Sequence, residues 1–213
     1  VRSMKSRENV YYLFWIFIVG CVVGWCIEGV FSLIKWKEFI NHSAVVIGPF
    51  NAAYGLGALV LTALLFKFKD DKIWKIFLIG FIGGSILEYI MSLGMELVLG
   101  FTAWDYSRKP FNINGRICVR YSLFWGALGI VWIKYIYPWL IKFIDKIDYD
   151  VGKKLAIWLS VFLLFDGILT GVAIDRARQK EKGVEAKYKY EEILDKTFNK
   201  EYLKNMYNDS WSD

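Results

Sequence analysis

Histidine and cysteine are scarce in this sequence of 213 residues, and their scarcity limits the chemistry that the chain can perform. His42 is the only histidine, and Cys21, Cys26 and Cys118 form neither a CxxC pair nor a Cys/His zinc spacing. We therefore predict no metal site and no cofactor. The sequence also lacks a G-x-x-x-x-G-K-[ST] loop and an evident nucleophile–base pair, so enzyme activity is not the first expectation.

Proline is also rare, with only Pro49, Pro110 and Pro138 in the whole chain. Because proline interrupts helices, its scarcity suits long helices. The formal net charge of +6 is compatible with nucleic-acid binding, but the basic residues flank the apolar segments and do not cluster on one polar domain. We therefore expect no nucleic-acid partner.

Apolar residues are abundant, at 56% of the chain, and they fall into blocks separated by short charged stretches. The blocks are about 18 to 25 residues long, which as helices matches the thickness of the bilayer hydrocarbon. The sequence therefore predicts an all-α, polytopic bundle of about five transmembrane helices in a lipid bilayer. The predicted parts are a basic N-terminal tail (1–9), a transmembrane bundle (10–174) with helices at about 10–34, 49–66, 73–99, 121–143 and 155–174, and a polar C-terminal tail (175–213).

The location that fits this pattern is the cell (plasma) membrane, crossed several times. Basic residues are almost evenly divided between the two sides, and only the basic tail before the first helix favours a cytoplasmic N-terminus. In the C-terminal tail, apolar residues from Tyr190 to Met206 recur near one helical face. This tail is either an amphipathic helix lying on the protein or membrane surface, or a solvated and partly disordered segment.

Two of the predicted helices share a row of residues spaced four apart. The rows are Gly20, Gly24, Glu28 and Ser32 in the first helix and Gly80, Gly84, Glu88 and Ser92 in the third, at an offset of 60 residues. The second and fourth helices open with Tyr54-Gly55 and Trp125-Gly126, at an offset of 71, and the fifth helix carries Gly167, Gly171 and Asp175. We interpret this as a duplicated two-helix unit plus one helix, the alternative being chance similarity between glycine-rich apolar segments.

The row also predicts an acidic site. Glycines four apart allow another helix to approach closely, and a carboxyl group on the same ridge is then turned away from lipid. The predicted packing glycines are Gly20, Gly24, Gly80, Gly84, Gly167 and Gly171. The predicted intramembrane pocket is formed by Glu28, Glu88, Glu96, Asp175, Ser32 and Ser92. Alternatively, the acids pair with nearby arginines and only hold the helices in register.

The loops before the second and fourth helices open on the same side as this pocket. Their polar and aromatic residues are Asn41, Trp104, Asp105, Tyr106, Asn112, Asn114 and Arg116. Asn114-Gly115 is a strong turn signal, Asp105 is suited to capping a short helix, and Arg116 offers a forked donor to an anion or a carboxylate. These residues either line the mouth of the pocket or serve turn formation and anchoring.

Several motifs occur in an order that resembles the bacterial ABC-transporter permease family, type IV, also called CmpB-like. They are "GPFNAAYGLGAL", "LEYIMSLGMELVLG", "WDYS" and "NINGRICVRYSLFWG". The resemblance covers about residues 10–175, and its matching positions are Glu28, Gly48, Pro49, Tyr54, Gly55, Glu88, Glu96, Trp104, Asp105, Asn114, Gly115, Arg116, Ser122, Trp125 and Gly126. It implies a multi-pass protein that acts as a permease, with no implied substrate. Any ATPase must then be a separate subunit.

Three functions remain open at this point. The first is a permease-like transporter component with an acidic intramembrane site; five helices are few for a complete pathway, so assembly with an ATPase subunit or with further copies is expected. The second is a non-catalytic membrane scaffold or sensor. The third is an intramembrane lipid-modifying enzyme, with Glu28 and Glu88 as general acid and base.

Overall fold

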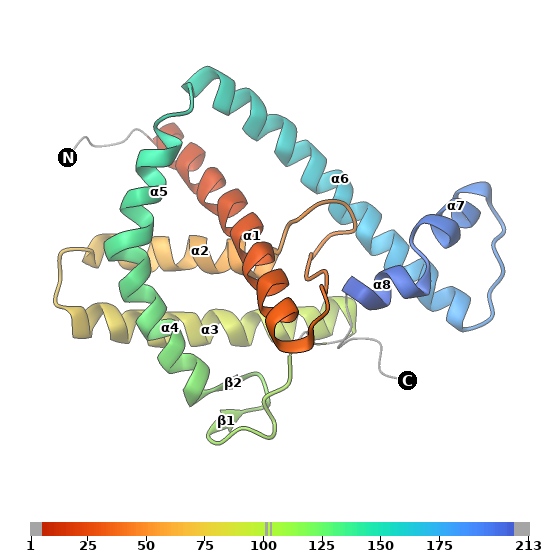
Figure 1. Ribbon diagram of the computed structural model, residues 1–213, viewed down its shortest axis with the longest axis horizontal. Coiled ribbons are helices and arrows are strands. Elements are labelled where there is room, and N and C mark those ends of the chain that lie inside the picture. The colour runs from red at the N-terminus through yellow and green to blue at the C-terminus, as the bar shows by residue number, and fades with distance from the viewer. Residues whose placement is uncertain (1–5, 101, 103, 207–213) are drawn as a thin grey trace.

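The computed structural model describes residues 6–100, 102 and 104–206 and shows a bundle of helices (Figure 1). Arg2 and Lys5 of the predicted basic tail lie outside the described residues. Four helices are long and apolar enough to cross a membrane: Val10–Trp36, Ile73–Val98, Val119–Ile144 and Tyr149–Glu181. The all-α membrane fold predicted from the sequence is thereby confirmed.

The first three helices run back and forth. They are α1 (Ser6–Trp36), α2 (Ala52–Leu65), which continues into the 3-10 turn η1 (Phe66–Phe68), and α3 (Ile73–Leu99). Helix α2 begins at Ala52, later than the predicted start at Pro49, because the side chain of Asn51 caps it by accepting the Ala53 N–H at 3.2 Å. With 14 residues, α2 is the short member of the five, and with η1 it reaches about 25 Å, less than the hydrocarbon thickness.

The fourth apolar segment is one interrupted helix. It consists of α4 (Val119–Val131), the π-helical turn η2 (Trp132–Ile136) and α5 (Tyr137–Ile144). Pro138 has no N–H to donate to the carbonyl four residues earlier, which explains why the regular pattern is broken in this region. Lys134 lies in the π-helical turn and donates to the carbonyl of Lys69 at 2.5 Å.

The fifth helix, α6 (Tyr149–Glu181), has 33 residues and extends beyond both predicted ends, 155 and 174. Asp148 caps its start by accepting the N–H groups of Asp150 and Val151, both at 3.1 Å. Two short helices follow, α7 (Lys189–Thr197) and α8 (Lys200–Met206). Both pack beside the end of α6 (Figure 1).

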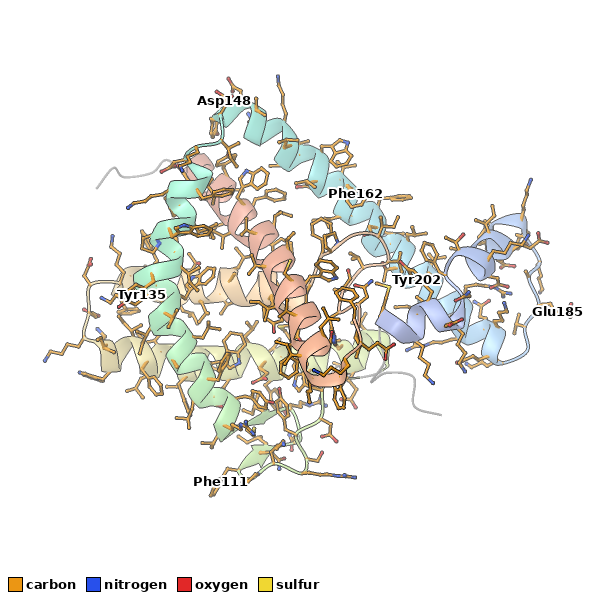
Figure 2. The ribbon with its side chains drawn as sticks, viewed as in Figure 1. Phe111, Tyr135, Asp148, Phe162, Glu185 and Tyr202 are labelled. Atoms are coloured by element: carbon orange, nitrogen blue, oxygen red, sulfur yellow. The ribbon has the colours of Figure 1, made fainter. Side chains whose placement is uncertain are left out.

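A small hairpin connects α3 to α4. Strand β1 (Asn112–Ile113) pairs with β2 (Ile117–Cys118) in antiparallel register, with Asn112 opposite Cys118. The turn contains Asn114 and Gly115, both with positive φ, as the Asn-Gly signal predicts. Figure 2 shows Phe111 at the edge of this hairpin, where its side chain is 83% exposed.

The α1–α2 and α3–α4 pairs pack through equivalent glycines. A β-carbon added to Gly20 would lie 3.1 Å from the α-carbon of Gly55, and one added to Gly80 would lie 3.4 Å from that of Gly126. A β-carbon at Gly24 would overlap the ring of Tyr54, and one at Gly84 would overlap the ring of Trp125. These contacts recur at the offsets of 60 and 71 residues that the sequence shows, which supports the duplicated two-helix unit.

Helix α6 does not continue this packing. A β-carbon added to Gly167 or Gly171 would meet no atom within 4 Å, so these two predicted packing glycines face open space in the single chain. In Figure 1, α6 stands apart from α2, α3 and α4 along much of its length. The expected contact at Gly167 and Gly171 is therefore absent from the described part of the chain.

The main apolar core lies toward the start of α1 and the end of α5. Its buried members are Tyr11, Ile16, Ala58, Leu61, Leu65, Ile76, Trp132, Ile133, Leu140 and Ile144. The end of α1, the hairpin and the tail helices lie on the other side of the molecule (Figure 1). We call this second side the loop side, and it carries the polar residues described next.

Candidate functional site

Glu88 is a buried acid near the middle of α3. Its side chain is 8% exposed and accepts a hydrogen bond from the Tyr106 hydroxyl at 3.0 Å and from the Trp125 indole N–H at 3.3 Å. These two donors come from the loop before the hairpin and from α4, and both are neutral. Burial, and secondarily the adjacent Glu88, raises the pKa of the Tyr106 phenol, so it remains a donor at neutral pH.

Arg116 of the hairpin contacts the next two residues of the same α3 row, Ser92 and Glu96. Its guanidinium donates to the Ser92 hydroxyl at 3.1 Å and forms an ion pair with Glu96. It also lies over the ring of Tyr89, 5.8 Å from the ring centre. The hydrogen bond with Glu96 raises the pKa of Arg116 further, so Arg116 keeps its positive charge at the loop end of α3.

The loop that carries Tyr106 and Arg116 is held by its own polar residues. The Trp104 indole N–H donates to the Arg116 carbonyl at 2.9 Å, and the Tyr106 N–H donates to the Gly115 carbonyl at 2.7 Å. Asp105 accepts the Ser107 N–H at 2.8 Å. The hydroxyl and N–H of Ser107 lower the pKa of Asp105, which therefore stays ionised in its turn. Asp105 stabilises this turn and does not cap a short helix.

Asn112 and Asn114 also belong to this framework. Asn112 accepts the Gly115 N–H at 3.0 Å, and Asn114 donates to the Tyr89 hydroxyl at 2.8 Å. A β-carbon at Gly115 would lie 2.7 Å from a carboxylate oxygen of Asp105, so glycine is required there by space as well as by its φ of +67°. The predicted loop residues therefore position Tyr106 and Arg116 against α3.

Glu28, the equivalent of Glu88 in the first repeat, has different surroundings. It is half-buried and accepts a hydrogen bond from the Tyr54 hydroxyl at 2.6 Å. Ser32 is buried and accepts the N–H of Ile40 at 3.1 Å, and Asn41 accepts the Trp25 indole N–H at 2.8 Å. The loop of the second repeat is longer than that of the first, and only there does a residue of this loop, Tyr106, donate to the acid.

Asp175 lies elsewhere again. It is exposed on α6 and accepts a hydrogen bond from Gln179 of the same helix at 2.8 Å. The four predicted acids thus have four different sets of partners. Glu88, Ser92, Glu96 and Arg116 do come together, and we call these four residues, with Tyr106 and Trp125, the Glu88 cluster.

Two polar residues of α6 were not assigned a role by sequence patterns. Asp166 is fully buried and accepts the N–H of Ile47 at 3.1 Å, and Thr170 accepts the N–H of Val46 at 3.0 Å. The spacing of four between Asp166 and Thr170 was visible in the sequence. Their partners could not be found from it, because they are backbone groups of a segment far away in the chain.

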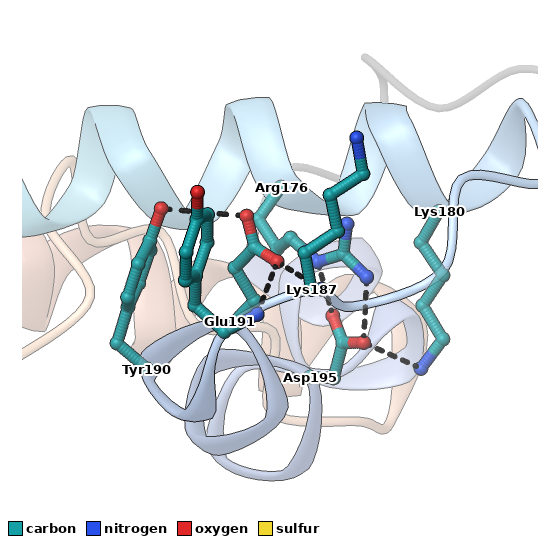
Figure 3. Close-up of polar contacts among 7 residues, drawn as sticks. Arg176, Lys180, Lys187, Tyr190, Glu191 and Asp195 are labelled. Atoms are coloured by element: carbon teal, nitrogen blue, oxygen red, sulfur yellow. Dashed lines mark hydrogen bonds and ion pairs between the residues drawn. The ribbon is translucent and has the colours of Figure 1, made fainter.

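The C-terminal tail is fastened to α6 by a second polar group (Figure 3). Arg176 of α6 donates two hydrogen bonds to Asp195 of α7, both at 3.0 Å, and Lys180 lies 3.7 Å from the same carboxylate. These bonds, with Arg176 first, lower the pKa of Asp195. The backbone N–H of Lys187 is the main cause that lowers the pKa of Glu191, which caps α7.

A groove of about 400 Å³ lies between α3, the start of α4 and the hairpin. Most of its lining is apolar, from residues such as Phe81, Ile86 and Ile117, and Ser85 and Ser122 also line it. Within the described ranges, no group of three or more His, Cys, Asp or Glu side chains is placed to hold a metal ion. The buried acids are therefore the groups of the loop side that are best suited to a chemical role.

The chain was compared with families, curated proteins and solved structures. A family model described as "Putative ABC-transporter type IV" matches residues 15–171, which run from α1 into α6 and end before the tail helices. The comparison with curated proteins and the comparison with solved structures found no match.

Proposed function

We propose that this chain, which belongs to the ABC-transporter type IV family, serves in transport through the Glu88 cluster, where a solute or a coupling ion binds. The family and the four long apolar helices support a membrane-embedded transporter component. The observation that carries the finer proposal is that the hydrogen bonds of buried Glu88 come from two neutral donors.

A carboxyl group inside a membrane is costly, by about 2.5–3.5 kcal/mol at a helix centre on insertion scales. Glu96 offsets this cost by its ion pair with Arg116. Glu88 receives hydrogen bonds without a compensating charge from either donor, so it is suited to carry a proton or to meet a cation. An acid that only held helices in register would be expected to resemble Glu96.

Transport by this chain alone is not part of the proposal. The sequence has no loop for binding ATP phosphates, so ATP-driven transport would use a separate ATPase subunit. Five helices provide little room for a pathway, which favours assembly with that subunit or with further copies. We place the protein in the plasma membrane with its N-terminus in the cytoplasm.

The test replaces Glu88 by Gln, which keeps the shape and removes the ionisable group. Cells producing wild-type protein, the Glu88→Gln variant or the Glu28→Gln variant at equal membrane levels are compared for small solutes by mass spectrometry and for ions by elemental analysis. We expect the change in cell content caused by the wild type to disappear with Glu88→Gln and to persist with Glu28→Gln. A wild-type effect that Glu88→Gln leaves intact would reject the role of Glu88.

A second candidate function, a membrane sensor or scaffold, is favoured by one observation. Helix α8 contacts the segment between α1 and α2, because Tyr202 of α8 donates to the carbonyl of Val46 at 2.8 Å. A partner that bound the tail could therefore act on the segment before α2. Loss of function on deleting the tail from Gly183, together with a silent Glu88→Gln, would favour this candidate over transport.

A lipid-modifying enzyme has less support. Glu28 and Glu88 would have to reach one substrate as acid and base, but Glu28 is bonded to Tyr54, whereas Glu88 is bonded to Tyr106 and Trp125. Nothing in these contacts joins the two carboxyl groups.

A further inference from the structure

The segment 43–50 is a stretch of non-helical backbone that packs against the middle of α6. Val46 is 3% exposed and belongs to an apolar cluster with Ala173 and Ala177 of α6. Asp166, the residue that reaches the segment, lies near the midpoint of the 33-residue helix. Non-helical backbone at such depth is tolerated only where protein groups satisfy its hydrogen bonds.

Two side chains of α6 and one of α8 supply these bonds. Asp166 accepts the N–H of Ile47, Thr170 accepts the N–H of Val46, and Tyr202 donates to the carbonyl of Val46. The labelled side chain of Tyr202 lies where α8 approaches α6 in Figure 2. The segment is therefore held between α6 and α8.

Asp166 uses only one of its two carboxyl oxygens in this arrangement. Its side chain is 0% exposed, its Oδ1 accepts the Ile47 N–H, and its Oδ2 is buried without a hydrogen-bond partner among the described residues. A negative charge cannot remain there at low cost, because a buried ion needs a partner. A neutral carboxylic acid, or a carboxylate bound to a cation, would satisfy the site.

We propose that Asp166 is a binding site for a monovalent cation, either a proton or Na⁺, and that an occupied site holds segment 43–50 against α6. An unoccupied site leaves a bare charge, which lowers its energy by reaching water, and the segment then separates from α6. The inference concerns binding and the position of this segment. It does not depend on flux through the Glu88 cluster, so either proposal can fail without the other.

The neighbouring titratable groups define the controls. His42 lies at the start of the segment, and Tyr202 contacts its backbone from α8. On α6 the next charged residues after Asp166 are Asp175 and Arg176, of which Arg176 is bonded to Asp195. Histidine is the residue type that changes charge in the physiological pH range, so His42→Asn separates the effect of His42 from that of Asp166.

The test measures amide hydrogen exchange of the peptide covering segment 43–50 in the full chain, reconstituted in lipid nanodiscs. Rates are corrected for the intrinsic pH dependence of exchange. As the pH rises and the Asp166 site loses its proton, we expect protection to fall in the wild type. Opening should rise by up to about tenfold per pH unit while the acid is ionised only when the segment has separated, and it should level off once the closed site has also lost its proton.

Variants and salt distinguish the alternatives. Asp166→Asn keeps an oxygen for the Ile47 N–H and needs no cation, so its protection should not change with pH, whereas His42→Asn should behave as the wild type. Thr170→Val should raise exchange equally at every pH. At high pH, Na⁺ in place of choline restores protection if Na⁺ is the ligand, and has no effect if the ligand is a proton.

The inference is overturned if wild-type protection is independent of both pH and Na⁺. It is also overturned if Asp166→Asn shows the same pH dependence as the wild type. Should Asp166→Asn fail to fold, the pH and Na⁺ series on the wild-type protein decide the question by themselves.

Discussion

Gly84 and Gly167 occupy similar places in the sequence, each within a G-xxx-G row, but they have opposite surroundings. Gly84 faces the ring of Trp125, whereas Gly167 faces open space. Sequence spacing cannot distinguish these two glycines, because both sit on an apolar helix with the same pattern. Only the position of the neighbouring helix shows which one is needed for close packing.

Replacing Gly84 by Leu should therefore destabilise the protein. The new side chain overlaps Trp125 and displaces an indole that donates to Glu88, and overpacking of this kind costs about 1–3 kcal/mol. The measurement is the midpoint of thermal unfolding in one detergent. Gly167→Leu is the matched control and should leave the midpoint nearly unchanged; equal losses for both variants would contradict the packing described here.

Individual site residues were predictable where the information was local. Ser92 and Glu96 follow Glu88 at steps of four, so their shared face of α3 could be predicted from the sequence. Asn114-Gly115 likewise predicted the turn that directly precedes Arg116. In the structure, Arg116 donates a hydrogen bond to Ser92 and forms an ion pair with Glu96.

Asp166 shows where such prediction ends. The carboxyl group was visible in the sequence, but its partner is the N–H of Ile47, 119 residues away in the chain. Every residue except proline carries a backbone N–H, so no side-chain pattern marks the one that will be used.

At the scale of elements, the tail helices are attached to α6 by a carboxylate whose pKa is lowered. Asp195 has its lowered pKa because Arg176 donates to it, so the ionised form stabilises the docked tail. This stabilisation is fully present above the unfolded value of about 3.9 and is lost as the pH falls through the lower folded value.

We therefore expect α7 and α8 to separate from α6 as the pH falls below about 4, the usual range of an aspartate. The measurement is hydrogen exchange, corrected for pH, of the peptide covering 189–206. Asp195→Asn should exchange several-fold faster at neutral pH and should lose the dependence on acid. A wild-type tail that stays equally protected through this acidic range would refute the attachment.

Element boundaries were predictable where hydropathy and helix ends coincide. Helix α3 was expected at 73–99 and is found there, and Gly100, with φ +74°, ends it in the left-handed conformation. Helix α6 was expected to be shorter, because its polar ends continue the helix beyond the apolar stretch. Hydropathy measures the membrane-compatible part of a helix and not its whole length.

The π-helical turn in the fourth segment was not expected. Its cause, Pro138, was visible, but whether a proline ends, kinks or widens a helix depends on its neighbours. The turn brings the side chain of Lys134 to the carbonyl of Lys69. Lys134 is a basic residue within an apolar span, so it was not counted among the basic residues of the loops.

On the scale of the whole molecule, the prediction that α2 crosses the bilayer together with the four long helices places the start of α1 and the end of α6 on opposite sides of the membrane. A reporter that is active only in the cytoplasm and one that is active only outside it, fused to either end, should give opposite results for the two ends. The N-terminal fusion should be the cytoplasmic one. Two ends on the same side would indicate that α2, the shortest helix, does not cross the bilayer.

The repeat of two helices was the most informative pattern in the chain. It predicted equivalent contacts for Gly20 and Gly80, and the structure places the equivalent glycines Gly55 and Gly126 against them. The sequence could not show that the acids of the two copies would have different hydrogen-bond partners. That difference comes from the longer second loop, which adds Tyr106 to one acid and leaves the other half-buried.

The contact between the two halves has an evolutionary consequence. Gly57 of the first half lies against Trp125 of the second, and Gly83 of the second lies against Leu64 of the first. An ancestor with a single two-helix unit could have formed such a contact only between separate chains. Joining the two units in one chain would have made that association permanent, and the loop of one unit could then lengthen while the loop of the other stayed short.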